Sequence, residues 1–432
     1  MTVKVAAGQR RARLAARHFV DGSCASAGAA AGAMIALHAT DPVTVYLSAW
    51  ARSRAETVAG VDRALYGERT LVRMLGMRRT MFVVPAALVP VVQRACTDDV
   101  AARLRRGIER DLAKGGVGGT DPAGWLRDAG EGVLAALAAR GSASGAELSA
   151  DEPRLRAQLA YAADKDYGRT ANITSRVLML LSAEGLIVRG ERRGGWSSGQ
   201  FTWHPMASWL PGRPDGARSE AVPGKAALTE AALNGPMLTE AALSEAALSE
   251  AVVNGAALAA PAARAELARR WLLAFGPAPV ADLQWWAGWT GAQTKAALAA
   301  LPVTEADLDG QPGVILASDL EPVPAAAPRA VLLPGLDPTP MGWQARDWFL
   351  GPHAPALFDR TGNIGPVIIW DGRVVGGWAQ RKSGEVVARL LEDAGTEAKA
   401  AVAAEGARLE GWLGEARVTP RFRTPLERQL SA

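Results

Sequence analysis

Three stretches of this 432-residue chain show the same order of expected elements, in which short helices are followed by β-rich sequence. The first stretch contains three helical segments and then a strand, at residues 10–20, 42–54, 61–74 and 80–84. Asp41-Pro42 opens the middle helix, because Asp caps a helix N-terminus well and Pro suits the first helical position. Helices followed by a strand in this order are typical of a winged helix-turn-helix.

The same order returns twice downstream. The second stretch has three helical segments and then a strand–turn–strand, at residues 134–139, 155–161, 172–183 and 186–203. The turn at 191–195 is basic and Gly-rich, as expected at the tip of a wing. A third copy is expected from helical segments at 264–275, 280–288 and 293–301.

The remaining sequence divides into an insert and a β-rich C-terminal part. Residues 215–262 repeat with a period of five, so their leucines share no helical face and we interpret them as a linker insert. Asp371-Gly372 predicts a hairpin, and 385–391 and 399–413 are expected to be helical. We predict an α+β fold of three tandem winged helix-turn-helix modules with a β-rich C-terminal part. The expected boundaries are 1–115, 116–214, 215–262 (the insert), 263–325 and 326–432.

Cysteine and histidine usage excludes several kinds of site. Two cysteines and four widely spaced histidines provide neither a disulfide framework nor a Cys/His metal spacing. The sequence also shows no phosphate-binding loop, no dinucleotide-binding fingerprint and no nucleophile elbow. We therefore expect no metal and no cofactor.

No segment predicts a membrane span. The longest uncharged stretches, such as 22–40, are mixtures of Gly, Ser and Ala rather than runs of about 20 large apolar residues. The arginine-rich N-terminus resembles the start of a signal sequence, but His18 and Asp21 interrupt the apolar core that a signal needs. We expect a cytoplasmic protein with no membrane partner.

The basic residues are mostly arginines, since only seven of the 48 are lysines. A GC-rich genome explains much of such a preference. Arginine also recognises phosphates and bases through its planar donors. The formal net charge is only +4, yet arginines precede or occupy the expected wings. Nucleotide bias does not explain that placement.

Several motifs together resemble the AlkZ/YcaQ-type DNA glycosylases. They lie along nearly the whole chain outside the insert, at residues 37–42, 46–52, 65–66, 71–81, 84–85, 185–187, 275–278, 371–376, 421–422 and 425–428.

This resemblance implies a specific fold and function. Members of the family are built from tandem winged helices around a concave basic surface. They hydrolyse the N-glycosidic bond of alkylated purines, notably N7-alkylguanines, and some act on bulky natural-product adducts or crosslinks for self-resistance. The implied partner is double-stranded DNA with an alkylated purine, in the nucleoid of a bacterium.

The family motif is altered here. Family members carry Gln-x-Gln or Gln-x-Asp before an acidic-Pro pair, and His38 and Thr40 occupy those two positions. Because an N7-alkylguanine is already a cationic leaving group, catalysis must mainly place a water and stabilise an oxocarbenium-like transition state. We expect His38 to orient or deprotonate the water, Thr40 to hold it, and Asp41 to offset the sugar's positive charge.

Each of these residues also has a structural interpretation. His38 can pair with backbone, Thr40 can be a β-branched strand residue, and Asp41 can serve only as the helix cap.

Basic residues near the expected wings are candidates for phosphate contacts. The candidates for DNA binding are Arg78, Arg79, Arg176, Arg189, Arg192, Arg193 and Trp196, the last as a wedge or stacking group. The alternative is a solvated surface for the arginines and inward packing for Trp196. Arg346 is a further surface candidate, and the spacing of Trp285, Trp286 and Trp289 predicts core positions.

Two functions from different classes remain. One is a monofunctional DNA glycosylase for alkylated purines, without a lyase step because no lysine lies near the motif. The alternative is a non-catalytic winged-helix DNA-binding protein or regulator that has lost the two glutamines. Three modules in one chain make a monomer sufficient.

Overall fold

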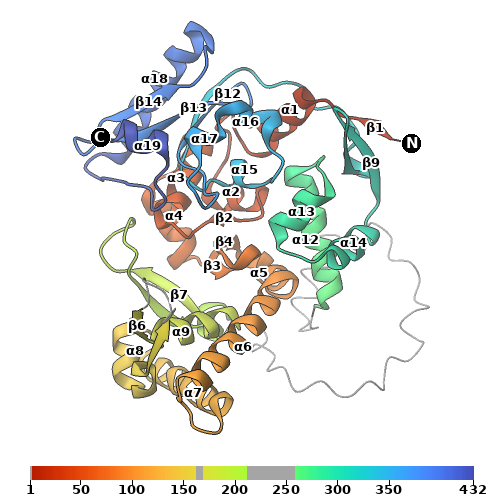
Figure 1. Ribbon diagram of the computed structural model, residues 1–432. Coiled ribbons are helices and arrows are strands. Elements are labelled where there is room, and N and C mark those ends of the chain that lie inside the picture. Colours follow the sequence, from red (N-terminus) through yellow and green to blue (C-terminus); the bar gives the residue numbers. More distant parts are fainter. Residues whose placement is uncertain (1, 162–168, 212–257) are drawn as a thin grey trace.

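The computed structural model describes residues 2–161, 169–211 and 258–432 (Figure 1). Most of the predicted insert, 215–257, lies outside these residues, whereas residues 260–262 already belong to a helix.

The N-terminal region combines short helices with a three-stranded sheet. Its elements are β1 (Val3–Lys4), α1 (Ala7–Arg17), α2 (Ala27–Ala33), β2 (Leu37–His38), α3 (Pro42–Arg52), α4 (Val58–Asp62), a π-helix (Arg63–Gly67), β3 (Leu71–Leu75) and β4 (Met81–Pro85). The sheet order is β2-β4-β3, with antiparallel pairing throughout. The prediction of one helix over 61–74 is wrong, because Leu71–Leu75 is a strand. All five of its residues are buried, so the run shows no strand-like alternation.

The second region is mainly helical. Its elements are α5 (Val89–Val92), α6 (Asp98–Lys114), α7 (Pro122–Arg140), α8 (Gly145–Asp151), β5 (Gln158–Tyr161), β6 (Arg169–Asn172), α9 (Thr174–Ala183), β7 (Ile187–Arg192), β8 (Phe201–Pro205) and α10 (Met206–Trp209). The helix predicted at 155–161 is wrong, because residues 158–161 form β5. The helix at this point is α8, which begins with a capping box between Ser144 and Glu147.

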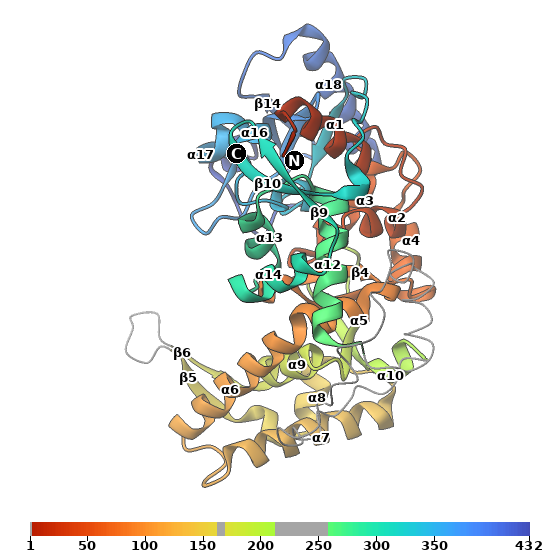
Figure 2. The same ribbon diagram turned by 90° about the vertical axis from the view of Figure 1, so that its right-hand side faces the viewer.

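The third region repeats the helical order on a smaller scale. It contains α12 (Ala260–Phe275), α13 (Val280–Ala287), α14 (Gly291–Ala299), β9 (Val303–Leu308) and β10 (Gln311–Leu316). The N-terminal β1 joins this sheet by parallel pairing with β9. Figure 2 shows α12 between the second region and the N-terminal elements.

One pairing pattern recurs in the three regions. In each, a short extended segment follows a helix, two further helices come next, and the second strand of a hairpin pairs back with the extended segment. The pairs are His38 with Phe82, Ala143 with Trp203, and Ala278 with Val314. The last two are single bridges.

The C-terminal part contains a four-stranded antiparallel sheet of order β11-β12-β13-β14. Its elements are β11 (Ala330–Leu333), α15 (Pro338–Met341), α16 (Asp347–Leu350), α17 (Ala354–Leu357), β12 (Val367–Trp370), β13 (Arg373–Gln380), β14 (Val386–Leu390), α18 (Gly395–Leu413) and α19 (Pro425–Leu430). The hairpin predicted at Asp371-Gly372 is confirmed, and both residues have positive φ, 48° and 69°. The helix predicted at 385–391 is wrong, because these residues pair with β13 as β14.

A buried ion pair joins α3 to the C-terminal part. Arg52, near the end of α3, donates to both carboxylate oxygens of Asp337 at 2.8 and 2.6 Å. The two side chains are 1% and 0% exposed. Ser48 and the backbone N–H of Thr339 also donate to Asp337. Burial alone raises the pKa of Asp337, but Arg52 and these hydrogen bonds outweigh burial and lower it.

Two kinds of feature are absent from the described part of the chain. No helix there is long and apolar enough to cross a membrane. No group of three or more His, Cys, Asp or Glu side chains is placed to hold a metal ion.

Replacing Asp337 by Asn should strongly destabilise the protein, because it leaves the Arg52 charge buried without a counter-charge. Loss of one partner of a buried pair costs about 3–5 kcal/mol. Urea denaturation measures this free energy. The matched control is Asp393→Asn, which removes a surface pair with Lys399 and should leave the midpoint unchanged. If the two variants have the same urea midpoint of unfolding, the buried pair does not stabilise the folded protein.

Candidate active site and nucleic-acid interface

The altered motif lies where β2 ends and α3 begins. Asp41 caps α3, since its Oδ1 accepts the N–H of Val43 at 3.2 Å, and this confirms the cap predicted for it. Its Oδ2 accepts the backbone N–H of Arg421 at 2.8 Å. Both oxygens of Asp41 therefore have fixed partners, one of them supplied by the C-terminal part.

His38 is buried rather than solvent-exposed, with 5% of its surface accessible. Its ring packs edge-on against Phe82 at 5.2 Å. Nδ1 accepts the backbone N–H of Thr40 at 3.4 Å, which leaves Nε2 as the protonated nitrogen of the neutral ring. Burial, followed by the positive charge of Arg78, lowers the pKa of His38 to about 3. The imidazole is therefore neutral at physiological pH.

Thr40 supplies an unsatisfied group beside this ring. Its Oγ1 is buried and has no hydrogen-bond partner in the part of the chain that the structure describes. The carbonyl of Thr40 accepts from the Arg421 guanidinium at 3.4 Å. A buried hydroxyl without a partner is unfavourable in the free protein and suits a site that receives a water or a ligand.

Arg78 and Arg79 form the turn that precedes β4, as expected. Both adopt left-handed backbone, with φ of 52° and 60°, a conformation that non-Gly residues rarely adopt. The Arg78 guanidinium lies 3.9 Å from the ring centre of Trp285, whereas Arg79 is exposed. Burial and then the charge of Arg346 lower the pKa of Arg78 to about 10. Arg346 lies 5.4 Å from the same Trp285 ring.

Trp285 corrects one sequence prediction. Its neighbours Trp286 and Trp289 are buried, as predicted for core residues. Trp285 itself is half-buried and contacts the two arginines, so it belongs to the surroundings of the motif rather than to the core.

The arginines of the second region have different surroundings. Arg176 on α9 forms an ion pair with Asp111 at 2.8 Å. Arg193 is exposed at the turn after β7, 3.9 Å from Glu147. Arg189 lies over the ring of Phe201 at 4.4 Å. Arg189 therefore lies on β7 and Arg193 just after it, whereas Arg176 lies on α9, and Arg176 and Arg193 each have a carboxylate partner.

Trp196 lies in the loop between β7 and β8, not in a strand as one sequence interpretation had it. Its ring is half-buried, 5.1 Å from Tyr46 of α3 and 5.7 Å from Trp412 of α18. The loop therefore contacts both the N-terminal region and the C-terminal part.

Sequence reasoning missed two arginines, one of which, Arg421, contacts the motif. Arg421 lies in a segment that resembles the family, but nothing in the sequence indicates that it contacts Thr40 and Asp41. Arg73 was hidden in the segment mistaken for a helix, and it is 5% exposed in β3.

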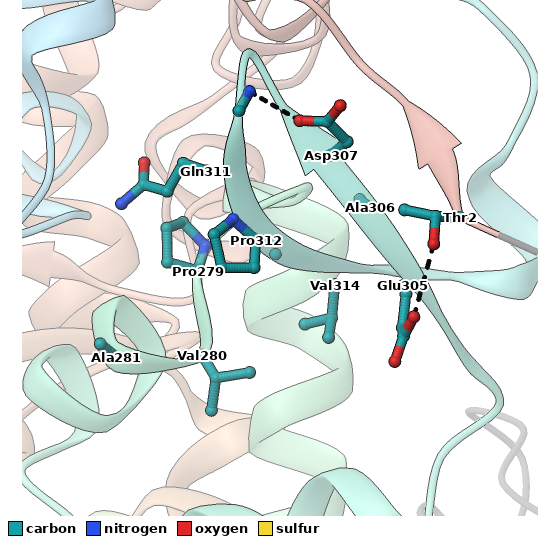
Figure 3. Close-up of a pocket in the computed structure, with 12 residues that line it drawn as sticks. Thr2, Pro279, Val280, Ala281, Glu305, Ala306, Asp307, Gln311, Pro312 and Val314 are labelled. Carbon is teal, nitrogen blue, oxygen red and sulfur yellow. Dashed lines mark hydrogen bonds between the residues drawn. The ribbon is translucent and has the colours of Figure 1, made fainter.

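A shallow hollow in the third region is unsuited to nucleic acid (Figure 3). It lies between β9–β10 and the start of α13, and its lining includes Pro279, Val280 and Pro312. Its charged lining residues are acidic, Glu305 and Asp307, and no arginine or lysine lines it in the described chain. Phosphates would be repelled from this surface.

Arginines and aromatic rings around a polar motif at a helix N-terminus are typical of a protein that acts on nucleic acid. The family model for the DNA glycosylase AlkZ-like family matches residues 31–412, and the chain belongs to that family. Its fold is similar to the solved structure of the Streptomyces sahachiroi DNA glycosylase AlkZ. The TM-score is 0.62 and the identity 21%, over 95% of this chain and 98% of that chain. No curated protein sequence matches the chain.

The His38 ring should not titrate between pH 5 and 8, because its pKa is about 3. An NMR titration of the labelled ring measures this, and the urea-unfolded chain, with a pKa near 6.5, is the control. The unfolded chain binds the proton more tightly. The contribution of His38 to folding is therefore complete above about pH 6.5 and is lost as the pH falls toward about 3. A folded-state midpoint near 6.5 would contradict the buried geometry.

Proposed function

We propose that this protein is a monofunctional DNA glycosylase that hydrolyses the N-glycosidic bond of alkylated purines. N7-alkylguanine is the proposed base, and bulky natural-product adducts or crosslinks are the proposed extension, in repair or in genotoxin self-resistance. Membership of the DNA glycosylase AlkZ-like family supports the reaction class. No lyase step is proposed, and a monomer is expected to suffice.

The recurring pairing pattern supports a modular scaffold. We interpret residues 1–115, 116–214 and 263–325 as three winged helix-turn-helix modules, followed by the C-terminal part at 326–432. The antiparallel return of each hairpin to a preceding extended segment supports this interpretation. The duplex would then cross the face that carries the motif, and Arg78 and Arg189 are the proposed phosphate contacts there.

The observation that carries the proposal is the buried hydroxyl of Thr40 beside His38, which has no partner among the described residues. A water can donate to Thr40 Oγ1 and keep one lone pair for the anomeric carbon of the sugar, while His38 fixes Thr40 through the contact of Nδ1 with its backbone N–H. With a pKa of about 3, His38 is too weak a base to take the proton at neutral pH, so it orients the water, and the proton that the water loses when it bonds to the anomeric carbon passes to solvent. Because the N7-alkylated base leaves as a neutral molecule, positioning is the main requirement.

Asp41 has a supporting role in this scheme. Its carboxylate caps α3 and fixes Arg421, so its proposed contribution is to offset the positive charge that develops on the sugar. We do not assign it as the nucleophile, because both of its oxygens accept backbone N–H groups.

Removing the Thr40 hydroxyl should slow base release about a hundredfold without weakening DNA binding. The substrate is a duplex with one N7-methylguanine, and single-turnover release and abasic sites are measured for the wild type, Thr40→Val and His38→Ala. Thr304→Val, at a half-buried threonine on β9, is the matched control and should retain the wild-type rate.

Two outcomes separate the alternatives. Tight binding with no release from either N7-methylguanine or a bulky N7-guanine adduct would favour the non-catalytic DNA-binding protein. Release that is unchanged in both motif variants would place the catalytic site elsewhere.

A further inference from the structure

Four arginines gather where β3 of the N-terminal region packs against β7 of the second region. They are Arg73 on β3, Arg189 and Arg192 on β7, and Arg421 from the C-terminal part. Each of the first three has at least one buried guanidinium nitrogen without a hydrogen-bond partner in the described chain. Arg421 connects this arginine cluster to the motif through its contact with the Thr40 carbonyl.

Arg73 is the most buried member of the arginine cluster. It is 5% exposed, and its Nε and one Nη have no acceptor among the described residues. Burial, followed by the charge of Arg192, lowers its pKa to about 10. A guanidinium is rarely buried without a carboxylate or phosphate partner, because the lost hydration is not otherwise replaced.

The two β7 arginines are half-buried, so the arginine cluster is not sealed from solvent. Arg192 donates to the Tyr66 hydroxyl at 3.2 Å, and one of its Nη atoms has no partner in the described part of the chain. Arg189 lies over the ring faces of Phe201 and Trp203, at 4.4 and 5.3 Å, and its buried Nε has no hydrogen-bond partner among the described residues. Burial lowers its pKa to about 10, as do the charges of Arg73, Arg421 and Arg192.

Negative charge near the arginine cluster is scarce. Among the described residues, Asp62 is the carboxylate that acts on Arg73, and its Oδ1 already accepts the Tyr46 hydroxyl at 2.5 Å. The charges that act on Arg189 are those of three other arginines, Arg73, Arg421 and Arg192. The arrangement is repulsive in the free protein and has unpaired donors for an anion.

We propose that Arg73, Arg189 and Arg192 form a binding site for one backbone phosphate of the DNA, close to the target nucleotide. The proposal rests on the proposed function and adds a specific phosphate contact that includes Arg73. A phosphodiester matches the site because guanidinium groups bind phosphate oxygens through paired N–H donors. The contact between Arg421 and Thr40 places this phosphate beside the motif rather than on a distant surface.

The proposal predicts opposite effects on stability and on binding. Arg73→Met keeps the volume of the side chain and removes a buried, unpaired charge, so the melting temperature of the free protein should rise. Affinity for duplex DNA should fall about tenfold. An arginine with only a structural role would lower the melting temperature when replaced. Arg127→Met, at an exposed arginine on α7, is the matched control and should change neither quantity.

A methylphosphonate scan identifies the phosphate. Single phosphates around an N7-methylguanine are replaced by neutral methylphosphonates, and dissociation constants are measured for the wild type and Arg73→Met. At one position the substitution should weaken wild-type binding about tenfold and leave Arg73→Met binding unchanged. Additive effects of the two changes at every position would overturn the proposal. If Arg73→Met fails to fold, the same scan is made with Arg189→Gln, at a half-buried position.

Inorganic phosphate distinguishes the source of the anion. If the site binds a DNA phosphate, millimolar inorganic phosphate should raise the melting temperature little more than chloride does at equal ionic strength. The methylphosphonate scan should then show one coupled position, at which the effects of the methylphosphonate and of Arg73→Met are not additive. Strong stabilisation by phosphate without a coupled position would identify a free-anion site and overturn the proposal. All of these readouts are binding or stability, so they remain decisive if base release itself is absent.

Discussion

The placement of the motif depends on the buried ion pair between Arg52 and Asp337. These residues are 285 positions apart, and their pairing fixes the C-terminal end of α3 against the loop before α15. The N-terminal end of the same helix is fixed by Asp41, which accepts the N–H of Arg421. Both ends of α3 are therefore attached to the C-terminal part, and the geometry of His38 and Thr40 requires that part to be folded.

The chemistry of the site follows from how its charges are distributed. Burial keeps His38 neutral, and beside it the hydroxyl of Thr40 has no partner within the residues that the structure describes. Positive charges lie near this neutral centre, since Arg78 acts on His38 and the Arg421 guanidinium contacts the Thr40 carbonyl. Such an arrangement suits a reaction in which the centre positions a water while its surroundings bind phosphates.

The sequence predicted the local features well and the tertiary ones poorly. The cap at Asp41, the hairpin at Asp371-Gly372 and the family resemblance rest on short motifs, and each was confirmed. The strand Leu71–Leu75 was missed because burial on all sides removes its alternation. The burial of His38 and the surroundings of Arg73 depend on residues far away in the chain, so no local pattern reveals them.

The central claim is that His38 and Thr40 act on one water. Single-turnover base release from an N7-methylguanine duplex, measured for the wild type, His38→Ala, Thr40→Val and the double variant, tests it most directly. If the two residues position the same water, the effects of their substitutions on the rate of base release should be strongly non-additive. The double variant should therefore be little slower than the slower single variant. Fully multiplicative losses, or a double variant as fast as the wild type, would contradict the account.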